Sequence, residues 1–235
     1  MKPEGIDRAE AMYKNAVLFG IKKFVYDGFL VSKLDSGDWL VWSYANKNTE
    51  YLVIPEFINV IMEGAFSDMT NLKEVVLPLR LKEINFKAFY NCFVLEKVNF
   101  PDSLLKIGNY AFYKTALQEI YIPDKVTYIG KHCFYGVQKA KLVSLPSHLT
   151  VDEEAFYLCG SEQRARGRDN FIFELREDVN GFSSIDMTPI THNSDIFREN
   201  LSAFYPSAAR KVYHITLYMP TSKYYNERKG RKKVM

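Results

Sequence analysis

The chain has 235 residues, of which 47% are hydrophobic, 25% charged and 15% aromatic. This composition supplies enough apolar material for a sizeable core and excludes a chain that is disordered throughout. The formal net charge of +3 is too small to indicate a nucleic-acid-binding protein by itself, and no run of about 18 apolar residues predicts a membrane span.

Residues 1–50 are predicted to form an N-terminal cap. An amphipathic helix is expected over residues 6–19, with its apolar face marked by Ile6, Met12, Ala16 and Phe19. A β-hairpin follows, with extended segments at residues 24–29 and 39–42 about a polar turn at residues 35–38. The first eight residues contain no apolar run, so no signal peptide is visible. A cytoplasmic or assembly-associated protein is therefore favoured over a secreted one.

Residues 51–160 contain an internal repeat of 22 or 23 residues. One marker is a proline preceded by an apolar residue, at Pro55, Pro78, Pro101, Pro123 and Pro146. The second marker is a phenylalanine preceded by Ala or Cys, at Phe66, Phe89, Phe112, Phe134 and Phe156. Two independent markers with one period over five copies predict a repeat architecture.

Each copy is predicted to contain a short strand that ends at its proline, because proline cannot donate the next ladder hydrogen bond. A second short extended piece follows before the phenylalanine. One such unit cannot bury its own apolar face, whereas stacked copies form a solenoid with a continuous core. The phenylalanines are expected to stack inside as a ladder. Cys92, Cys133 and Cys159 fall on core positions of the repeat and are predicted to be buried rather than reactive.

The segments Ile-Gly-Asn-Tyr-Ala-Phe (107–112) and Ile-Gly-Lys-His-Cys-Phe (129–134) resemble the unit of the BspA-type leucine-rich repeat family. That unit reads as an apolar residue and Pro, then Ile-Gly, then Ala-Phe, and the resemblance covers about residues 50–160. It implies a β-rich leucine-rich-repeat solenoid, here with an N-terminal helix and β-hairpin cap and an irregular inserted C-terminal segment. The family resemblance also suggests adhesion or host-protein binding.

The outward face of the strands is the candidate partner-binding face. The residues four and two positions before each proline are expected to point away from the core. In the first four copies they are Tyr51, Val53, Glu74, Val76, Lys97, Asn99, Glu119 and Tyr121. One interpretation is that Glu74, Lys97 and Glu119 form cross-strand charge pairs, each worth roughly 0.2–1 kcal/mol. The other is a recognition surface with Tyr51 and Tyr121 as anchors.

The C-terminal part departs from the period. Residues 161–212 are predicted to be an insertion or a capping segment, and residues 213–235 a closing strand with a basic tail. The tail has one acid, Glu227, and six basic residues: Lys223, Arg228, Lys229, Arg231, Lys232 and Lys233. Such a cluster could contact nucleic acid, an anionic surface or an acidic partner, or it could be a solubilising end.

The sequence offers no enzyme signature. It contains no Gly-rich phosphate loop, nucleophile elbow or paired-histidine zinc motif, so no catalytic residue, cofactor or metal is predicted. His132 and His148 fall on linking segments and are expected to be solvated.

The leading hypothesis is a non-enzymatic module for protein interaction or structure, with a protein partner whose identity and stoichiometry the sequence does not specify. Three alternatives stay open: a component of an intracellular or virion assembly, a nucleic-acid-associated protein acting through the basic tail, and an enzyme with its site in residues 161–212.

Overall fold

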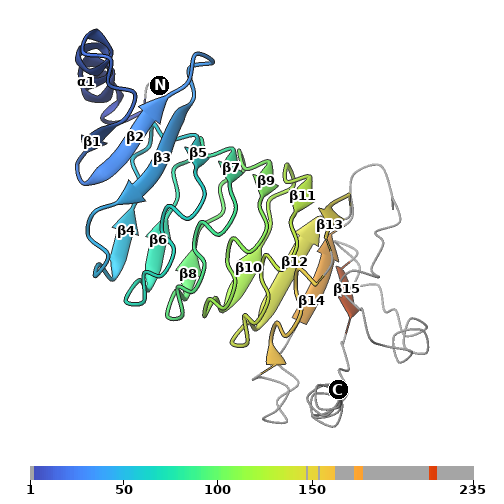
Figure 1. Ribbon diagram of the computed structural model, residues 1–235. Coiled ribbons are helices and arrows are strands. Elements are labelled where there is room, and N and C mark those ends of the chain that lie inside the picture. The colour runs from blue at the N-terminus through green and yellow to red at the C-terminus, as the bar shows by residue number, and fades with distance from the viewer. Residues whose placement is uncertain (1–2, 147, 153, 162–171, 177–211, 216–235) are drawn as a thin grey trace, which may run out of the picture.

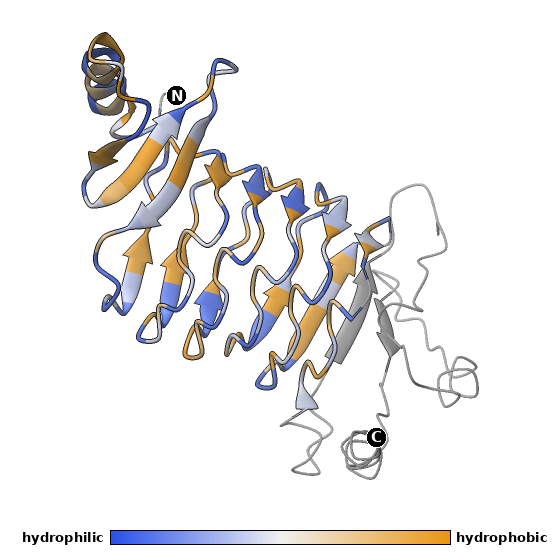
Figure 2. Ribbon diagram, in the orientation of Figure 1, coloured by the Kyte–Doolittle hydropathy of each residue, from blue (hydrophilic) through white to orange (hydrophobic). Residues whose placement is uncertain are grey.

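The computed structural model describes residues 3–146, 148–152 and 154–161, together with the backbone of residues 172–176 and 212–215. Figure 1 shows a solenoid in which two rows of short strands follow one another along the molecule, with helix α1 (Ile6–Leu18) at its N-terminal end. Two neighbouring residues in each strand point to opposite sides. The short strands therefore carry hydrophobic and hydrophilic residues side by side (Figure 2).

One row of strands forms an eight-stranded sheet. In spatial order its strands are β1 (Phe24–Tyr26), β2 (Phe29–Lys33), β3 (Trp39–Tyr44), β5 (Val60–Ile61), β7 (Glu83–Ile84), β9 (Lys106–Ile107), β11 (Tyr128–Ile129) and β13 (Thr150–Val151). The first three strands pair antiparallel, whereas β3 pairs in parallel with β5 and each later strand in parallel with the next. The N-terminal hairpins thus extend this sheet beyond the first repeat.

The other row is divided into two sheets. A three-stranded parallel sheet contains β4 (Tyr51–Val53), β6 (Glu74–Val76) and β8 (Lys97–Val98). A four-stranded sheet contains β10 (Glu119–Tyr121), β12 (Leu142–Pro146), β14 (Ile172–Arg176) and β15 (Val212–Ile215). The strand β14 lies within the segment predicted as an insertion, yet it pairs in parallel with β12 and continues the sheet.

The turns around the repeat phenylalanines have a fixed backbone geometry. The residues two before and two after the phenylalanine have positive φ, as at Tyr110 (58°) and Lys114 (56°) on either side of Phe112. Their N–H groups donate to the following repeat, Tyr110 to Lys131 O and Lys114 to Tyr135 O, at 2.9 and 2.8 Å. Each left-handed residue therefore aims a backbone donor at the neighbouring copy, which satisfies groups that the turn would otherwise leave unpaired.

The predicted phenylalanine ladder is confirmed. Rings of consecutive copies are stacked with centroids 5.1 to 5.3 Å apart, and all five rings are buried. The three cysteines are buried as predicted, and the Sγ atoms of Cys92 and Cys159 lie 3.2 and 3.1 Å from carbonyl oxygens of the core. The core is therefore one continuous column along the repeats.

Helix α1 covers the N-terminal end with a narrower face than predicted. Ala9 and Ala16 are buried, and Ile6 and Met12 are partly buried against the core. The expectation that Phe19 belongs to this face is wrong, because its side chain is 81% exposed. The helix ends at Leu18, and the chain then turns away from the helix axis before Phe19 can reach the core.

Two further details differ from the sequence expectations. The segment predicted as one extended piece at residues 24–29 is split into two strands by a turn at Asp27 and Gly28, both with positive φ. The side chain of His132, predicted to be solvated, is only 15% exposed. Its Nδ1 atom lies 3.3 Å from Oε2 of Glu154, and its ring centroid lies 4.9 Å from that of Tyr110. The repeat neighbours on either side therefore enclose it.

Candidate partner-binding face

The strand face predicted as a partner surface does point away from the core. The side chains of Tyr51, Val53 and Tyr121 are 64%, 65% and 51% exposed, and Val76 is 38% exposed. Lys97, Asn99 and Glu119 are also exposed, and Glu74 is half-buried. The alternation arises because Leu52, Val75 and Ile120, between the outward residues, are buried in the core.

The three-stranded sheet brings the first of these residues into rows. Tyr51 stands opposite Glu74 and Glu74 opposite Lys97, whereas Val53 stands opposite Val76. Tyr51, Val53 and Val76 consequently form one exposed apolar cluster over β4 and β6. We call these three residues the β4–β6 cluster.

The two tyrosines expected to act together as anchors are not neighbours. Tyr51 lies on β4 and Tyr121 on β10, so β6 and β8 lie between them and the two belong to different sheets. A partner that contacts both must span the full width of the three-stranded sheet. The β4–β6 cluster is the more compact surface.

The second row of strands divides between β8 and β10, and Asn99 directly follows β8. Its side-chain Oδ1 accepts the N–H of Leu77 at 2.7 Å, and its Nδ2 donates to the carbonyl oxygen of Leu77 at 3.2 Å. The amide thus extends the contact between the repeats of β6 and β8, on the side of β8 away from β10. In addition, the chain from Phe112 to Pro123 is one residue shorter than the matching segments of the other copies. The side chain of Asn99 therefore holds two repeats together rather than standing free on the face.

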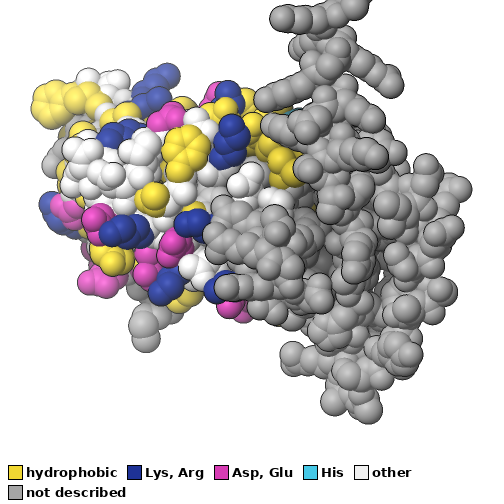
Figure 3. Space-filling view, turned by 90° about the horizontal axis from the view of Figure 1, so that it is seen from below, with side chains coloured by type: hydrophobic (Ala, Val, Ile, Leu, Met, Phe, Trp, Pro, Cys, Tyr) yellow, Lys and Arg dark blue, Asp and Glu magenta, His cyan; other side chains and the backbone are white. Residues whose placement is uncertain are grey.

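The charged residues of the face do not pair as one interpretation expected. The ion pairs within the described ranges do not include Glu74 with Lys97, or Lys97 with Glu119. The pair nearest this row is Lys73 with Glu50, at 2.7 Å, and the hydrogen bond that Lys73 donates to Glu50 raises the pKa of Lys73. Both side chains are about half exposed, so this pair contributes little to stability. Charge is also mixed rather than segregated on the described part of the side seen in Figure 3.

A second aromatic ladder was missed in the sequence. The rings of Tyr90, Tyr113, Tyr135 and Tyr157 are stacked with centroids 5.0 to 5.3 Å apart, beside the phenylalanine ladder. These tyrosines are half-buried, and Lys114 Nζ lies 5.3 Å from the centre of the Tyr113 ring. The sequence contains a signal for this ladder, because a tyrosine directly follows the repeat phenylalanine in four of the five copies.

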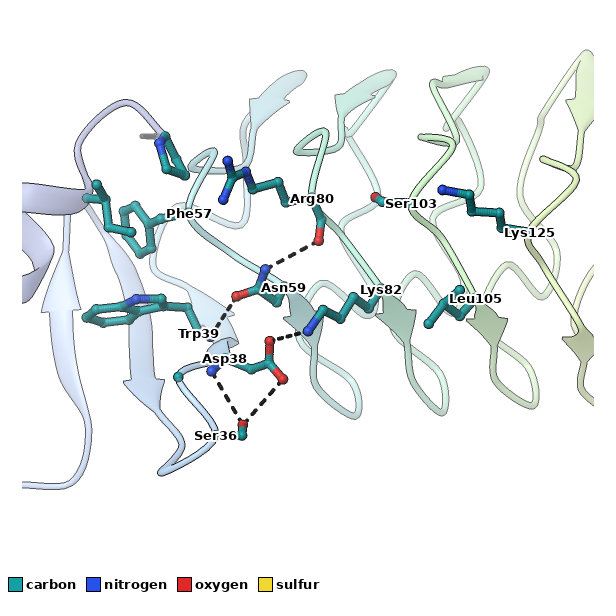
Figure 4. A pocket seen from close by; sticks show the side chains of 13 residues that line it. Ser36, Asp38, Trp39, Phe57, Asn59, Arg80, Lys82, Ser103, Leu105 and Lys125 are labelled. Carbon is teal, nitrogen blue, oxygen red and sulfur yellow. Dashed lines mark hydrogen bonds and ion pairs between the residues drawn. The ribbon is translucent and has the colours of Figure 1, made fainter. Parts of the chain in front are cut away.

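A shallow groove of about 590 Å³ lies where the N-terminal cap meets the repeats (Figure 4). Some of its polar side chains join the two parts. Lys82 forms an ion pair with Asp38 at 2.6 Å, and Asn59 accepts the N–H of Trp39 and donates to the carbonyl of Arg80. The groove is therefore a seam between cap and solenoid, and it combines residues 44 positions apart that no local pattern could have related.

The indole of Trp39 forms the floor of this seam. Its Nε1 atom is buried and has no hydrogen-bond partner among the described residues, and the side chain is 1% exposed. Three rings surround it edge-on, those of Tyr13, Phe24 and Phe57, with centroids 5.1 to 6.1 Å away. The ammonium of Lys33 also lies over the indole, with Nζ 5.4 Å from the ring centre.

Within the described ranges no three His, Cys, Asp or Glu side chains come together in a way that could hold a metal ion. In the same part of the chain no helix has the length and apolar character that crossing a bilayer requires. The predicted basic tail, from Lys223 to Lys233, lies outside the described residues.

Comparison with known families places this architecture. The sequence model of the BspA type leucine-rich repeat region matches residues 42–162, with six copies. The chain belongs to the BspA-type leucine-rich repeat family. The match has six copies, one more than the five counted from proline and phenylalanine, and it begins at residue 42, ahead of the first proline marker. Membership of the family supports a protein-interaction repeat module, and repeat scaffolds of this kind are typically non-enzymatic.

Solved structures of other leucine-rich repeat proteins resemble this BspA-type chain. The leucine-rich repeat protein of T. pallidum is 25% identical with a TM-score of 0.55, and the match covers 60% of this chain and 69% of that protein. The pneumococcal vaccine antigen PcpA is 30% identical with a TM-score of 0.47 over 57% of this chain and 31% of its own. A leucine-rich cell surface protein from Faecalibacterium prausnitzii is 18% identical with a TM-score of 0.45, over 59% and 52% of the two chains. A comparison with curated proteins gave no match.

Proposed function

We propose that this BspA-type chain binds a protein partner through the outward face of β4 and β6, with the β4–β6 cluster at the centre of the contact. The observation that supports the proposal is the exposure of Tyr51 and Val53, at 64% and 65%, on a rigid parallel sheet. Tyrosine is enriched among the residues that dominate binding energy at interfaces. A side chain that is already restrained on a sheet also loses less conformational freedom on binding.

The position of β4 supports the same surface. Among the described strands β4 has a ladder partner on one side only, since it is the first strand of its sheet and pairs with β6 alone. The N-terminal hairpins extend the eight-stranded sheet and leave this second row without an equivalent cap. A partner can therefore approach both the face and the outer edge of β4.

The test begins with capture of partners by the whole chain from its native source and identification by mass spectrometry. The double variant Tyr51→Ala with Val53→Ala is expected to bind the captured partner with an affinity about 30-fold lower. A loss of that size corresponds to removal of a central interface residue. Leu79→Ala is the matched control, because Leu79 is 71% exposed but lies outside these strands. Normal binding by the double variant would show that the partner uses another surface.

The family resemblance suggests adhesion, including binding to a host protein, as the setting of this interaction. This finer role is tested by attachment of the purified chain to host cells or immobilised matrix proteins. The Tyr51→Ala with Val53→Ala variant should lose the attachment that the Leu79→Ala control retains. Attachment that is absent for the unmodified chain would leave an assembly role as the better interpretation.

The basic tail supports a second candidate, association with nucleic acid, through its six Lys and Arg residues and single Glu. Such binding should weaken steeply with salt, since it depends on release of counterions from phosphate groups. Deletion of residues 223–233 should abolish it. Binding that survives the deletion, or that is absent at low salt, would exclude this role.

A further inference from the structure

The end of helix α1 and the residues after it carry an exposed apolar cluster that the core does not use. Leu18 and Phe19 are 80% and 81% exposed, and Val17 and Ile21 are 52% and 47% exposed. Every residue from 17 to 23 is classed as exposed. Isolated apolar side chains are common on protein surfaces, but contiguous large ones at this exposure mark a site of interaction. We call residues 17–23 the α1 tip.

The α1 tip is held by backbone hydrogen bonds rather than by packing. Gly20 has a φ of 69°, its N–H donates to Val17 O at 3.0 Å, and the N–H of Ile21 donates to Ala16 O at 2.9 Å. This pair of bonds is the Schellman arrangement that closes a helix at a left-handed glycine. A Cβ atom at position 20 would meet no atom within 4 Å, so the space beside the turn is open. The apolar residues are thus presented on a convex, pre-formed turn.

The charge around the tip has one sign. Residues 11–26 contain Lys14, Lys22 and Lys23 and no acidic residue, and all three lysines are exposed. Lys23 Nζ lies 3.2 Å from the centre of the Trp42 ring, which leaves its charge at the surface. The nearest acids in the sequence on either side, Glu10 and Asp27, are paired with Lys33 and Arg8. The α1 tip therefore combines exposed apolar side chains with the positive charge of nearby lysines.

We propose that the α1 tip docks on an anionic lipid surface. In this arrangement Leu18, Phe19 and Ile21 enter the boundary between headgroups and acyl chains, and the lysines contact lipid phosphates. The interface of an anionic bilayer complements both features, because its acyl chains are apolar and its headgroups carry negative charge. Interfacial anchors of other proteins combine the same residue types. A convex turn also suits a deformable lipid layer, because it needs no matching pocket. The attachment is peripheral and leaves the β4–β6 cluster free.

The test is co-sedimentation of the purified full chain with vesicles of phosphatidylcholine, with and without phosphatidylserine. Binding is expected only with phosphatidylserine and should fall as salt rises, because exposed charges are screened. The variant Leu18→Ser with Phe19→Ser should bind about tenfold more weakly or worse, since the buried apolar area supplies much of the affinity. Lys14→Glu with Lys22→Glu should remove the preference for phosphatidylserine.

The control variants separate this inference from misfolding and from the proposed partner face. Leu79→Ser, which changes an equally exposed leucine on the repeats, should bind vesicles normally, as should Tyr51→Ala with Val53→Ala. The tip side chains are solvent-exposed, so the tip variants should unfold at the same urea concentration as the unmodified chain. Absence of binding to phosphatidylserine vesicles, or equal binding by the Leu18→Ser with Phe19→Ser variant, would overturn the proposal. The proposal would also be overturned if the Leu18→Ser with Phe19→Ser variant bound vesicles normally but no longer captured a protein that the unmodified chain captures.

Discussion

The aromatic rings of Phe112 and Phe134 lie 5.3 Å apart between centroids and only 3° from parallel, in a core where both are fully buried. Each ring packs between those of the copies before and after it. The stability of such a column comes from contacts between nearest neighbours along the solenoid. A change at the centre of the column therefore affects two interfaces at once.

Phe112→Ala should destabilise the chain by about 3–5 kcal/mol, because it removes a fully buried ring and leaves a cavity between two repeats. Phe93→Ala is the matched control, since Phe93 is 50% exposed and its loss should change the free energy of unfolding by about 0.5 kcal/mol or less. Urea unfolding followed by circular dichroism measures both. Equal losses for the two variants would contradict a central role for the ladder.

Asn99→Ala should cost about 1–3 kcal/mol for each backbone group of Leu77 that it leaves unpaired, because Leu77 is fully buried. Asn99→Asp should lose less, since a carboxylate still accepts the N–H of Leu77. Lys97→Ala, on the same strand face, should be nearly neutral because that side chain is exposed. Chemical unfolding of the three variants ranks them, and an alanine variant as stable as the lysine variant would show that the amide bonds contribute nothing.

Gly108→Ala should destabilise the solenoid although the φ of Gly108 is not in the left-handed region. A Cβ at this position would lie 2.9 Å from the backbone C of Asn85 and from the backbone N of Phe86. The two repeats would have to move apart, at a cost of roughly 1–3 kcal/mol. Gly37→Ala makes the comparison, because a Cβ there meets no atom within 4 Å and only its positive φ of 92° is unfavourable. Thermal unfolding should show the larger loss at position 108.

The hydroxyl of Tyr128 donates to Asp152 Oδ2 at 2.5 Å. Burial, and then this bond, raise the pKa of Tyr128 from 10 to about 12. Folding therefore favours the protonated phenol, so the stabilisation is complete below pH 10 and is lost as the pH rises towards 12. The difference in unfolding free energy between the unmodified chain and Tyr128→Phe should shrink across that window. A difference that stays constant would rule out the hydrogen bond as its source.

The three cysteines should not react with a thiol reagent in the folded chain near pH 8, close to the pKa of a free thiol. Burial raises the pKa of Cys92 to about 12 and the pKa of Cys133 well above its ordinary value, and Cys159 is 2% exposed. All three thiols should react once urea unfolds the chain, as a colorimetric assay with Ellman's reagent would show. Rapid reaction of one thiol in native conditions would indicate local opening of the repeat that contains it.

Much of the fold could be predicted because the repeat is a local pattern. The spacing of the markers placed Phe89 and Phe112 in one column and assigned Cys92 to the core, and the structure confirms both. The outward orientation of Tyr51 and Tyr121 followed from the same register, because side chains alternate along a strand. The copies fold nearly alike, so the burial of a side chain at one repeat position predicts the burial at the same position of the next copy.

The exceptions arise where the chain bends out of its local pattern. Phe19 was assigned to the helix face, but the helix ends one residue earlier and the left-handed Gly20 reverses the chain. His132 was expected in solvent, but the positive φ of the residue, 52°, belongs to the turn that sets its ring beside Tyr110. In both cases backbone direction, not residue type, decided the exposure of the side chain.

The period, the strand that ends at each proline and the residues of the core follow from the order of side chains within one copy, so they can be predicted from the amino-acid sequence. Which strands share a sheet depends on how the copies lie against one another in the folded chain. The second row of strands is divided between β8 and β10, and the pair of Lys82 with Asp38 joins the cap to the repeats. Hydrogen bonding between copies depends on the relative displacement of two backbones. A periodic sequence does not encode that displacement at any single position, so the boundaries of the candidate partner-binding face are set by the folded chain.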